Sequence, residues 1–524
     1  METADVERPL IHHLPPQDEV SQYTSDGTLD INNKPALKQS TGNWRACFMI
    51  LGAEFTECMA FFAIGKNLVT FLTAELRETN VDAAKNVSTW IGSCFLTPVI
   101  GAFLADTYWG RYKTIVIFLL IYIIGMLILT VSASLPLIMY VPHNSGIRRV
   151  AAYLGLYLVA LGTGGIKPCT SALGADQFDS ADPVERATKG SFFNWKVYRY
   201  KKQGGSPLTS VAQVVVAAVR NYHLVLPEHS FHIWQCKIVH GLTYIWQCFW
   251  SRFLDKAAIV VPCTGEKGKA ATTSPWKLCT ESQVEELKML LRMLPVWASM
   301  VLFFTATAQM SSTFIEQGAV MDTGVGPFTV PPASLATFDV ISVMVCIPIY
   351  DAVLVPLARR ATGKDRGLSQ LQRIGVGLAL SVVGMAYAAV VEGRRLALVR
   401  AHMPAMSIMW QAPAFAVLGA GEVFAAIGTL EYFYDQSPEG MKSLGSALAY
   451  LTIAAGNYLN SAVLAAVAAA TTASGGAEPG WIPDDLNKGH LDYFFWMMAA
   501  LCLMNLAQFA HRSIRYRGQE KQVC

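Results

Sequence analysis

Ten apolar stretches, each long enough to cross a bilayer as a helix, most constrain what this chain can fold into. A membrane-spanning helix needs roughly 20 mostly apolar residues. Four such stretches lie before residue 175 and six after residue 288. They run over 45–73, 89–107, 112–136, 150–174, 289–316, 334–358, 370–392, 408–434, 444–470 and 491–512. The sequence therefore predicts an all-α polytopic membrane protein.

The composition supports this class and argues against others. Only 15% of the 524 residues are charged, whereas soluble domains carry about 25%. The net charge of +3 comes with no basic domain, so we expect no nucleic-acid partner. The 11 cysteines are scattered without a C-x-x-C pair, which indicates neither a disulfide framework nor a metal site. Without a nucleophile elbow or phosphate loop, we expect neither an enzyme nor a cofactor.

The spacing of the spans divides the chain into five parts. We predict a polar cytosolic tail (1–42), a four-span half (43–175), a cytosolic linker (176–288), a six-span half (289–512) and a short tail (513–524). Within the linker, the apolar segment 206–226 follows a Gly-Gly-Ser-Pro breaker. A helical period groups Val211, Val214, Val215 and Ala218 on one side. We therefore expect an amphipathic helix on the cytosolic surface there, rather than an eleventh span.

Basic residues in short loops place both termini in the cytosol. Arg111 lies in one such loop, whereas Arg395 falls on the outer side and does not fit. Asp106 and Asp351 each close a span at the cytosolic end and precede a basic turn. Such an acid can cap the next helix and pair with an arginine, which would lock the inner face shut. Alternatively, both acids simply belong to ordinary cytosolic loops. The similar pattern in the two halves suggests a transporter built from repeats.

Ionisable residues inside the spans are the candidate functional groups, because burying them is costly. Glu54 and Glu57 are three residues apart and so share one helical face. Two close carboxylates in a low dielectric cannot both ionise cheaply, so the pair is a candidate proton carrier. Alternatively, Glu54 lies in the interface and meets water. Lys167 stands among glycines in the fourth span and could bind a carboxylate, bridge to these acids or snorkel.

The six-span half supplies the opposite charge. Glu422 lies in the apolar middle of the eighth span. A cation site at Lys167 and an anion site at Glu422, facing each other across a cleft, would suit a zwitterion. Gln309 in the fifth span is a neutral residue that could line the cleft or join helices by packing.

Four segments carry a family resemblance: GAFLADTYWGRYKTI, LGTGGIKPCTSALGADQFD, SFFNW and GEVFAAIGTLEYFYDQSPEGMKSLGSALAYL. They strongly resemble the plant nitrate/peptide transporter family, a proton-dependent oligopeptide transporter group of the major facilitator superfamily. The di- and tripeptide-transporting branch looks most similar. The resemblance implies a twelve-helix bundle in which SFFNW opens the fifth helix, whereas KVYRYKKQGGSPL resembles the segment after the sixth helix. It therefore implies that a helical hairpin is missing between Trp195 and Lys196, which leaves ten spans.

The resemblance also implies roles for the charged residues. Glu54, Glu57 and Lys167 would couple protons, and Lys167 and Glu422 would bind the two ends of a peptide. The family arginine beside the acids is replaced by Cys58, and a tyrosine pair by two phenylalanines, which puts coupling and affinity in doubt. Thr307 occupies the position where the nitrate-transporting relative has histidine, which argues against nitrate.

These expectations combine into one function and one rival. The first is a monomeric proton-coupled symporter of small peptides or related zwitterions, working by alternating access in the plasma membrane or, second, the vacuolar membrane. Its partners would be the solute, protons and the lipid bilayer. The rival is a non-transporting, truncated variant, because four helices leave cleft-lining polar groups exposed to lipid.

Overall fold

The computed structural model describes residues 43–139, 146–175, 207–223, 253–258, 276, 278–362, 368–437, 442–472 and 480–523. Within this part of the chain, ten helical segments are long and apolar enough to cross a membrane. Each overlaps one of the ten predicted spans. The prediction of an all-helical membrane protein with four spans followed by six is therefore confirmed.

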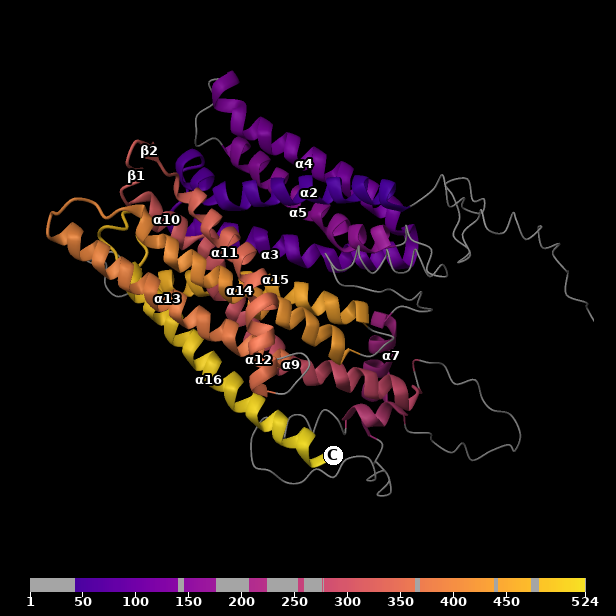
Figure 1. The fold of residues 1–524 in the computed structure, drawn as a ribbon. Helices are drawn as coiled ribbons and strands as arrows, with labels where there is room; N and C mark the ends of the chain where they lie inside the picture. Colours follow the sequence, from indigo (N-terminus) through magenta and orange to yellow (C-terminus); the bar gives the residue numbers. More distant parts are fainter. Residues whose placement is uncertain are drawn as a thin grey trace, which may run out of the picture.

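The first four spans form one group, seen in indigo and purple in Figure 1. The spans lie side by side along a common direction (Figure 1). They comprise α2 (Asn43–Thr70) with η1 (Phe71–Glu75), α3 (Asn80–Leu104) with η2 (Ala105–Trp109), α4 (Arg111–Met139) and α5 (Gly146–Ala175).

The six later spans form a second group. They comprise α9 (Glu281–Thr307) with η5 (Ala308–Ser311) and α10 (Thr313–Ala319); η6 (Pro332–Leu335) with α11 (Ala336–Ile349), η7 (Tyr350–Leu354) and α12 (Val355–Thr362); α13 (Gln370–Arg400); η8 (Ile408–Gln411) with α14 (Ala412–Gln436); α15 (Lys442–Thr472); and α16 (Leu491–Val523). A short hairpin of β1 (Gly324–Val325) and β2 (Phe328–Thr329) follows α10.

Capping residues explain where two of these helices begin. Thr280 and Gln283 form a capping box at the start of α9, and Ser369 and Gln372 form another at α13. Each box satisfies backbone N–H groups that a helix otherwise leaves without partners. Helix α9 therefore starts at Glu281, before the predicted linker boundary at 288, and its first turns are polar.

Glycines allow the helices of the first half to pack closely. A Cβ atom at Gly101 of α3 would collide with the backbone of Gly164 on α5, and one at Gly165 would collide with the Phe118 ring on α4. These glycines beside Lys167 therefore permit close packing of α5 against α3 and α4. Close packing fixes where α5 presents that lysine.

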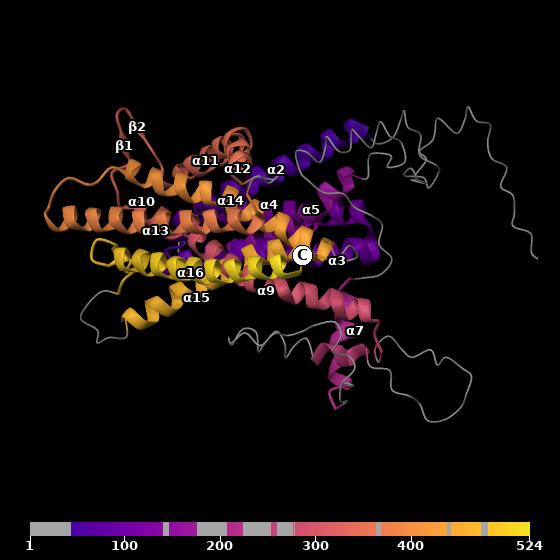
Figure 2. The ribbon, with the colours of Figure 1, turned by 60° about the horizontal axis from the view of Figure 1, so that its bottom comes forward.

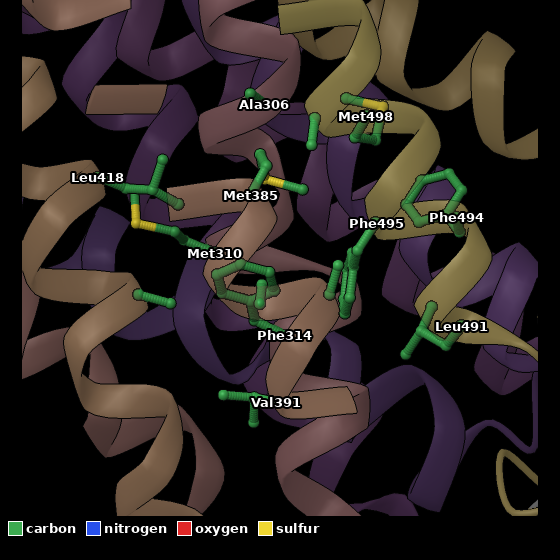
Figure 3. Packing of buried hydrophobic residues seen from close by; sticks show 14 of the residues in the cluster. Ala306, Met310, Phe314, Met385, Val391, Leu418, Leu491, Phe494, Phe495 and Met498 are labelled. Atoms are coloured by element: carbon green, nitrogen blue, oxygen red, sulfur yellow. The ribbon is translucent and has the colours of Figure 1, made fainter. Parts of the chain in front are cut away.

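Each half has its own apolar core. In the first half, Trp90 is buried and donates its indole N–H to the Leu156 carbonyl over 2.8 Å. In the second half, Phe314 packs edge-on against Phe415 and Phe495, as Figure 3 illustrates for two of these rings. The two cores also take in one buried residue each from the other half, Ala84 of α3 in the second core and Ile315 of α10 in the first.

The two halves meet at the predicted outer end. Asn80 donates its side-chain amide to the Pro483 and Asp484 carbonyl oxygens, both over 3.1 Å. Further along the α3–α15 contact, Thr89 donates to Ser461 over 3.0 Å and Asn460 donates to Ser88 over 2.9 Å. These hydrogen bonds hold the halves together at that end.

The linker contains helix α7 (Pro207–Arg220), beside the start of α9 in Figure 2. Val214, Ala217 and Ala218 are buried in one cluster with residues of η4 (Lys256–Ala258) and the first turns of α9. Val215, predicted on the same side of the helix as Val214 and Ala218, is 42% exposed and does not share their burial. The helix packs along 211, 214 and 218, and 215 lies outside that stripe. The junction at Trp195–Lys196 lies outside the described residues.

Candidate functional site

A buried ion pair joins the first and fourth spans. Lys167 Nζ lies 3.8 Å from Glu57 Oε1, and the two side chains are 11% and 1% exposed. The lysine therefore bridges to a span 1 acid, one of the arrangements predicted for it, and does not snorkel. The separation is longer than a hydrogen bond, so the attraction is mainly that of two charges.

Two aromatic rings surround the lysine. Its Nζ lies 3.8 Å from the centroid of the Phe61 ring and 4.9 Å from that of Phe95. A ring face attracts a cation, and the attraction grows when water is excluded. Phe61 is one of the two phenylalanines at the family tyrosine positions, so here the position stabilises the lysine rather than offering a hydroxyl.

Glu54 faces the same helix as Glu57. The Thr170 hydroxyl on α5 donates a hydrogen bond to Glu54 Oε2. The predicted shared face of the two acids is confirmed, because both side chains contact α5. Glu54 is only half-buried, whereas Glu57 is buried.

Glu422 belongs to a second group of charged residues, to which both halves contribute. It is half-buried on α14, and the charged groups that act on it are Asp339 of α11 and Lys66 of α2. Lys66 also donates to Ser311 of η5 over 3.1 Å, a contact between the two halves. Sequence reasoning missed Lys66 and Asp339. Both lie inside predicted spans, so the cost of burying an ionisable group was the signal that could have found them.

Gln309 is fully buried and hydrogen-bonded. Its amide donates to Asn460 Oδ1 over 2.6 Å and to the Thr305 carbonyl over 3.1 Å, and its oxygen accepts from Thr313 over 2.7 Å. Of the two predicted roles, these contacts favour helix packing, because a solute does not reach a fully buried amide in this conformation.

A second buried ion pair was not predicted. Arg395 donates to both carboxylate oxygens of Glu392 over 2.7 and 2.8 Å, and to Asn487 over 2.6 Å. Gln317 donates to Glu392 over 2.7 Å. Arg395 departs from the basic-loop rule because its charge is neutralised within the bundle. The spacing of acid and base three residues apart was the available signal.

The predicted inner gate is only partly described. The side chains of Asp106 and Asp351 lie outside the described residues. Arg111 begins α4 and is half-buried. Their gating role stays a prediction.

A cavity of about 350 Å³ reaches Glu57 from the side, between α2 and α4. Thr56 of α2 and Ile123 and Leu127 of α4 line it and are exposed. On α2, the side chains of Phe55, Met59 and Phe62 recur at helical spacing and are exposed. The carboxyl group of Glu57 therefore lies near exposed apolar side chains of α2 and α4.

Comparison with known proteins places these features in a family. The POT family profile matches residues 112–197 and 193–482. The chain is 44% identical to Protein NRT1/ PTR FAMILY 8.3 of Arabidopsis thaliana over 578 residues, covering 98% of each protein. It is 35% identical to Protein NRT1/ PTR FAMILY 7.3 of the same plant, covering 96% of this chain and 94% of that protein.

Solved structures share the fold. The structure titled an auto inhibited POT family peptide transporter matches with a TM-score of 0.66 and 22% identity, covering 90% of this chain and 97% of that one. A POT family transporter in complex with a thioalcohol conjugated peptide matches with a TM-score of 0.58 and 12% identity, covering 95% and 99%.

The comparisons also bear on the predicted deletion. The two family matches meet at residues 193–197, which contain Trp195 and Lys196. The alignment with the first Arabidopsis relative spans 578 residues, more than the 524 of this chain. The relative therefore carries residues that this chain lacks.

Proposed function

Because this chain belongs to the POT family of membrane transporters, we propose that it is a proton-coupled symporter of small peptides or related zwitterions. The observation that carries the proposal is the buried Glu57–Lys167 pair in the half opposite Glu422. When Glu57 takes up a proton, it loses its negative charge and no longer holds the Lys167 ammonium group. The lysine is then free to bind the carboxylate of a solute.

The second half provides the acid for the ammonium end of the solute. Glu422 on α14 is the acid that would bind the ammonium group, as the anion site of the zwitterion. The halves are joined at the predicted outer end through Asn80, Thr89 and Asn460. Alternating access requires these contacts to break when the outer side opens. We place this function in the plasma membrane.

Uptake by cells that express the chain tests the proposal. We expect uptake of a radiolabelled dipeptide to rise as the external medium is acidified. Glu422→Ala and Lys167→Ala should each abolish it, because each removes the charge that binds one end of the solute.

The matched control is Glu431→Gln on the same helix as Glu422. Glu431 pairs with Arg373 over 3.4 Å and is 36% exposed, so this variant should retain uptake. Surface labelling should show equal amounts of every variant. Uptake that survives both alanine substitutions would remove the proposed solute clamp.

A rival function has its own observation. The lateral cavity at Glu57 and the exposed residues Phe55, Met59 and Phe62 of α2 support it. The rival is a non-transporting variant that folds but does not cycle. Insertion of the helical hairpin of an Arabidopsis relative between Trp195 and Lys196 discriminates the two. Equal uptake with and without the hairpin refutes the rival, and uptake only with it refutes the symporter function of this chain.

A further inference from the structure

Asp339 lies directly against the backbone of α14. A Cβ atom at Gly419 would be 2.5 Å from Asp339 Oδ1 and 2.8 Å from the Asp339 carbonyl oxygen. Only glycine leaves room for the carboxyl group at this point. Asp339 is 9% exposed, and its Oδ1 has no hydrogen-bond partner among the residues that the structure describes. A buried carboxyl oxygen of this kind needs a proton or a cation nearby.

Glu422 follows Gly419 by three residues and therefore lies one helical turn away on the same side of α14. Because Asp339 packs against α14 at Gly419, the two carboxyl groups lie on the same side of that helix about one turn apart. Lys66 of α2 is the cation that acts on both of them. Within the described part of the chain, the charged groups that act on this pair are thus each other and Lys66.

The charge of this cluster does not balance without a proton. Two ionised carboxylates and one ammonium leave a net negative charge in a low-dielectric site, which is unfavourable. A single shared proton makes the cluster neutral. The first half repeats the composition, with Glu57 beside Lys167 and Glu54 hydrogen-bonded to Thr170 on the same helix as the lysine.

We propose that Asp339 and Glu422 share one proton across Gly419, with Lys66 as counter-ion, and so form a second proton-binding pair. This proposal rests on the proposed function where it assigns the solute ammonium to Glu422. The proton and the ammonium group then compete for the same two carboxyl groups. Acid drives transport through Glu57 and at the same time weakens the binding of the cationic end of the solute.

Infrared spectroscopy tests the pair without requiring transport. The purified chain in nanodiscs should show a carboxylic-acid C=O band that disappears in one step as the pH is raised. Asp339→Asn and Glu422→Gln should each remove the step from its original pH and leave one at lower pH, because the remaining carboxyl group then titrates without its like-charged neighbour. Asp322→Asn, which changes an exposed acid, is the control and should leave the step unchanged.

The transport readout is the KM for a dipeptide at several external pH values. In the unaltered chain we expect KM to rise by about tenfold per pH unit below the titration of the pair, because one proton competes with one ammonium group. In Asp339→Asn the rise should move to lower pH, because the neighbouring like charge is gone. Lys66→Met should move it to higher pH.

The outcomes separate the two proposals. Loss of the infrared step from its original pH in both variants supports the pair, even if the chain transports nothing and the proposed function fails. An Asp339→Asn spectrum that retains the step at its original pH, or variants that remove two independent steps, overturns the pair while the symporter function stands. If Asp339→Asn cannot be purified folded, Glu422→Gln decides alone, and persistence of the step at its original pH overturns the proposal.

Discussion

At the residue scale, the lysine of the fourth span is held by one acid and two rings. Lys167 lies against Glu57 at 3.8 Å and over Phe61 at the same distance from the ring centroid. Cys58 stands where the family resemblance implies an arginine, so Lys167 carries the counter-charge for Glu57. Removing either partner leaves the other as a buried charge.

A double-mutant cycle measures this coupling. We expect Lys167→Met and Glu57→Gln each to lower the melting temperature in detergent. The double variant should be more stable than the sum of the two changes by about 0.5–3 kcal/mol, the range for groups in contact. Additive effects would show that the two side chains do not interact in the folded protein.

At the scale of elements, the glycines of the first half determine how closely helices approach. Gly101 of α3 lies against Gly164 of α5, so a side chain at either position would push the helices apart. Gly393 of α13 has no atom within 4 Å of a Cβ at that site. A side chain should therefore be tolerated at Gly393 but not at Gly101 or Gly164.

Substitution tests this difference. We expect Gly164→Val to reduce sharply the yield of monodisperse protein in fluorescence size-exclusion chromatography, because overpacking a helix contact costs roughly 1–3 kcal/mol or more. Gly393→Ala should leave the yield unchanged. Equal yields from both variants would contradict the close α3–α5 contact.

The spans were predictable because hydropathy and length determine them almost alone in a bilayer. The pairing of Lys167 with a span 1 acid was predictable as one of several options, since helix faces follow from spacing. The exposure of Val215 was not predictable, and neither was the choice between the two roles predicted for Gln309, because both depend on which helix lies opposite. Lys66 and Asp339 could have been found by considering every charged residue within a predicted span. That they belong to one charged group could be seen only in the folded bundle.

At the scale of the whole molecule, two helical bundles meet at the predicted outer end through Asn80, Thr89 and Asn460. The buried charges lie in both bundles, and Lys66 contacts the second bundle at Ser311. In the first bundle, Phe55, Met59 and Phe62 are exposed. Transport therefore requires that a bundle of four helices still moves against one of six.

Breaking the outer contact tests that movement. Asn80→Ala removes two hydrogen bonds to the 483–484 backbone. We expect a cysteine-reactive probe applied from outside to label a cysteine introduced at Ser93 faster in this variant, because the closed outer end opens more often. Ser93 shares a hydrogen bond with Tyr458 in the contact between halves. Unchanged labelling would show that Asn80 does not hold the outer end closed.

The most direct measurement is dipeptide accumulation by the purified chain in proteoliposomes under an imposed proton gradient and membrane potential. One charge moved through 100 mV supplies about 2.3 kcal/mol, which corresponds to roughly 50-fold accumulation. We predict accumulation that requires the gradient, collapses with a protonophore and is absent in Lys167→Ala. Dipeptide that only equilibrates across the membrane, or that does not enter at all, would contradict proton-coupled symport.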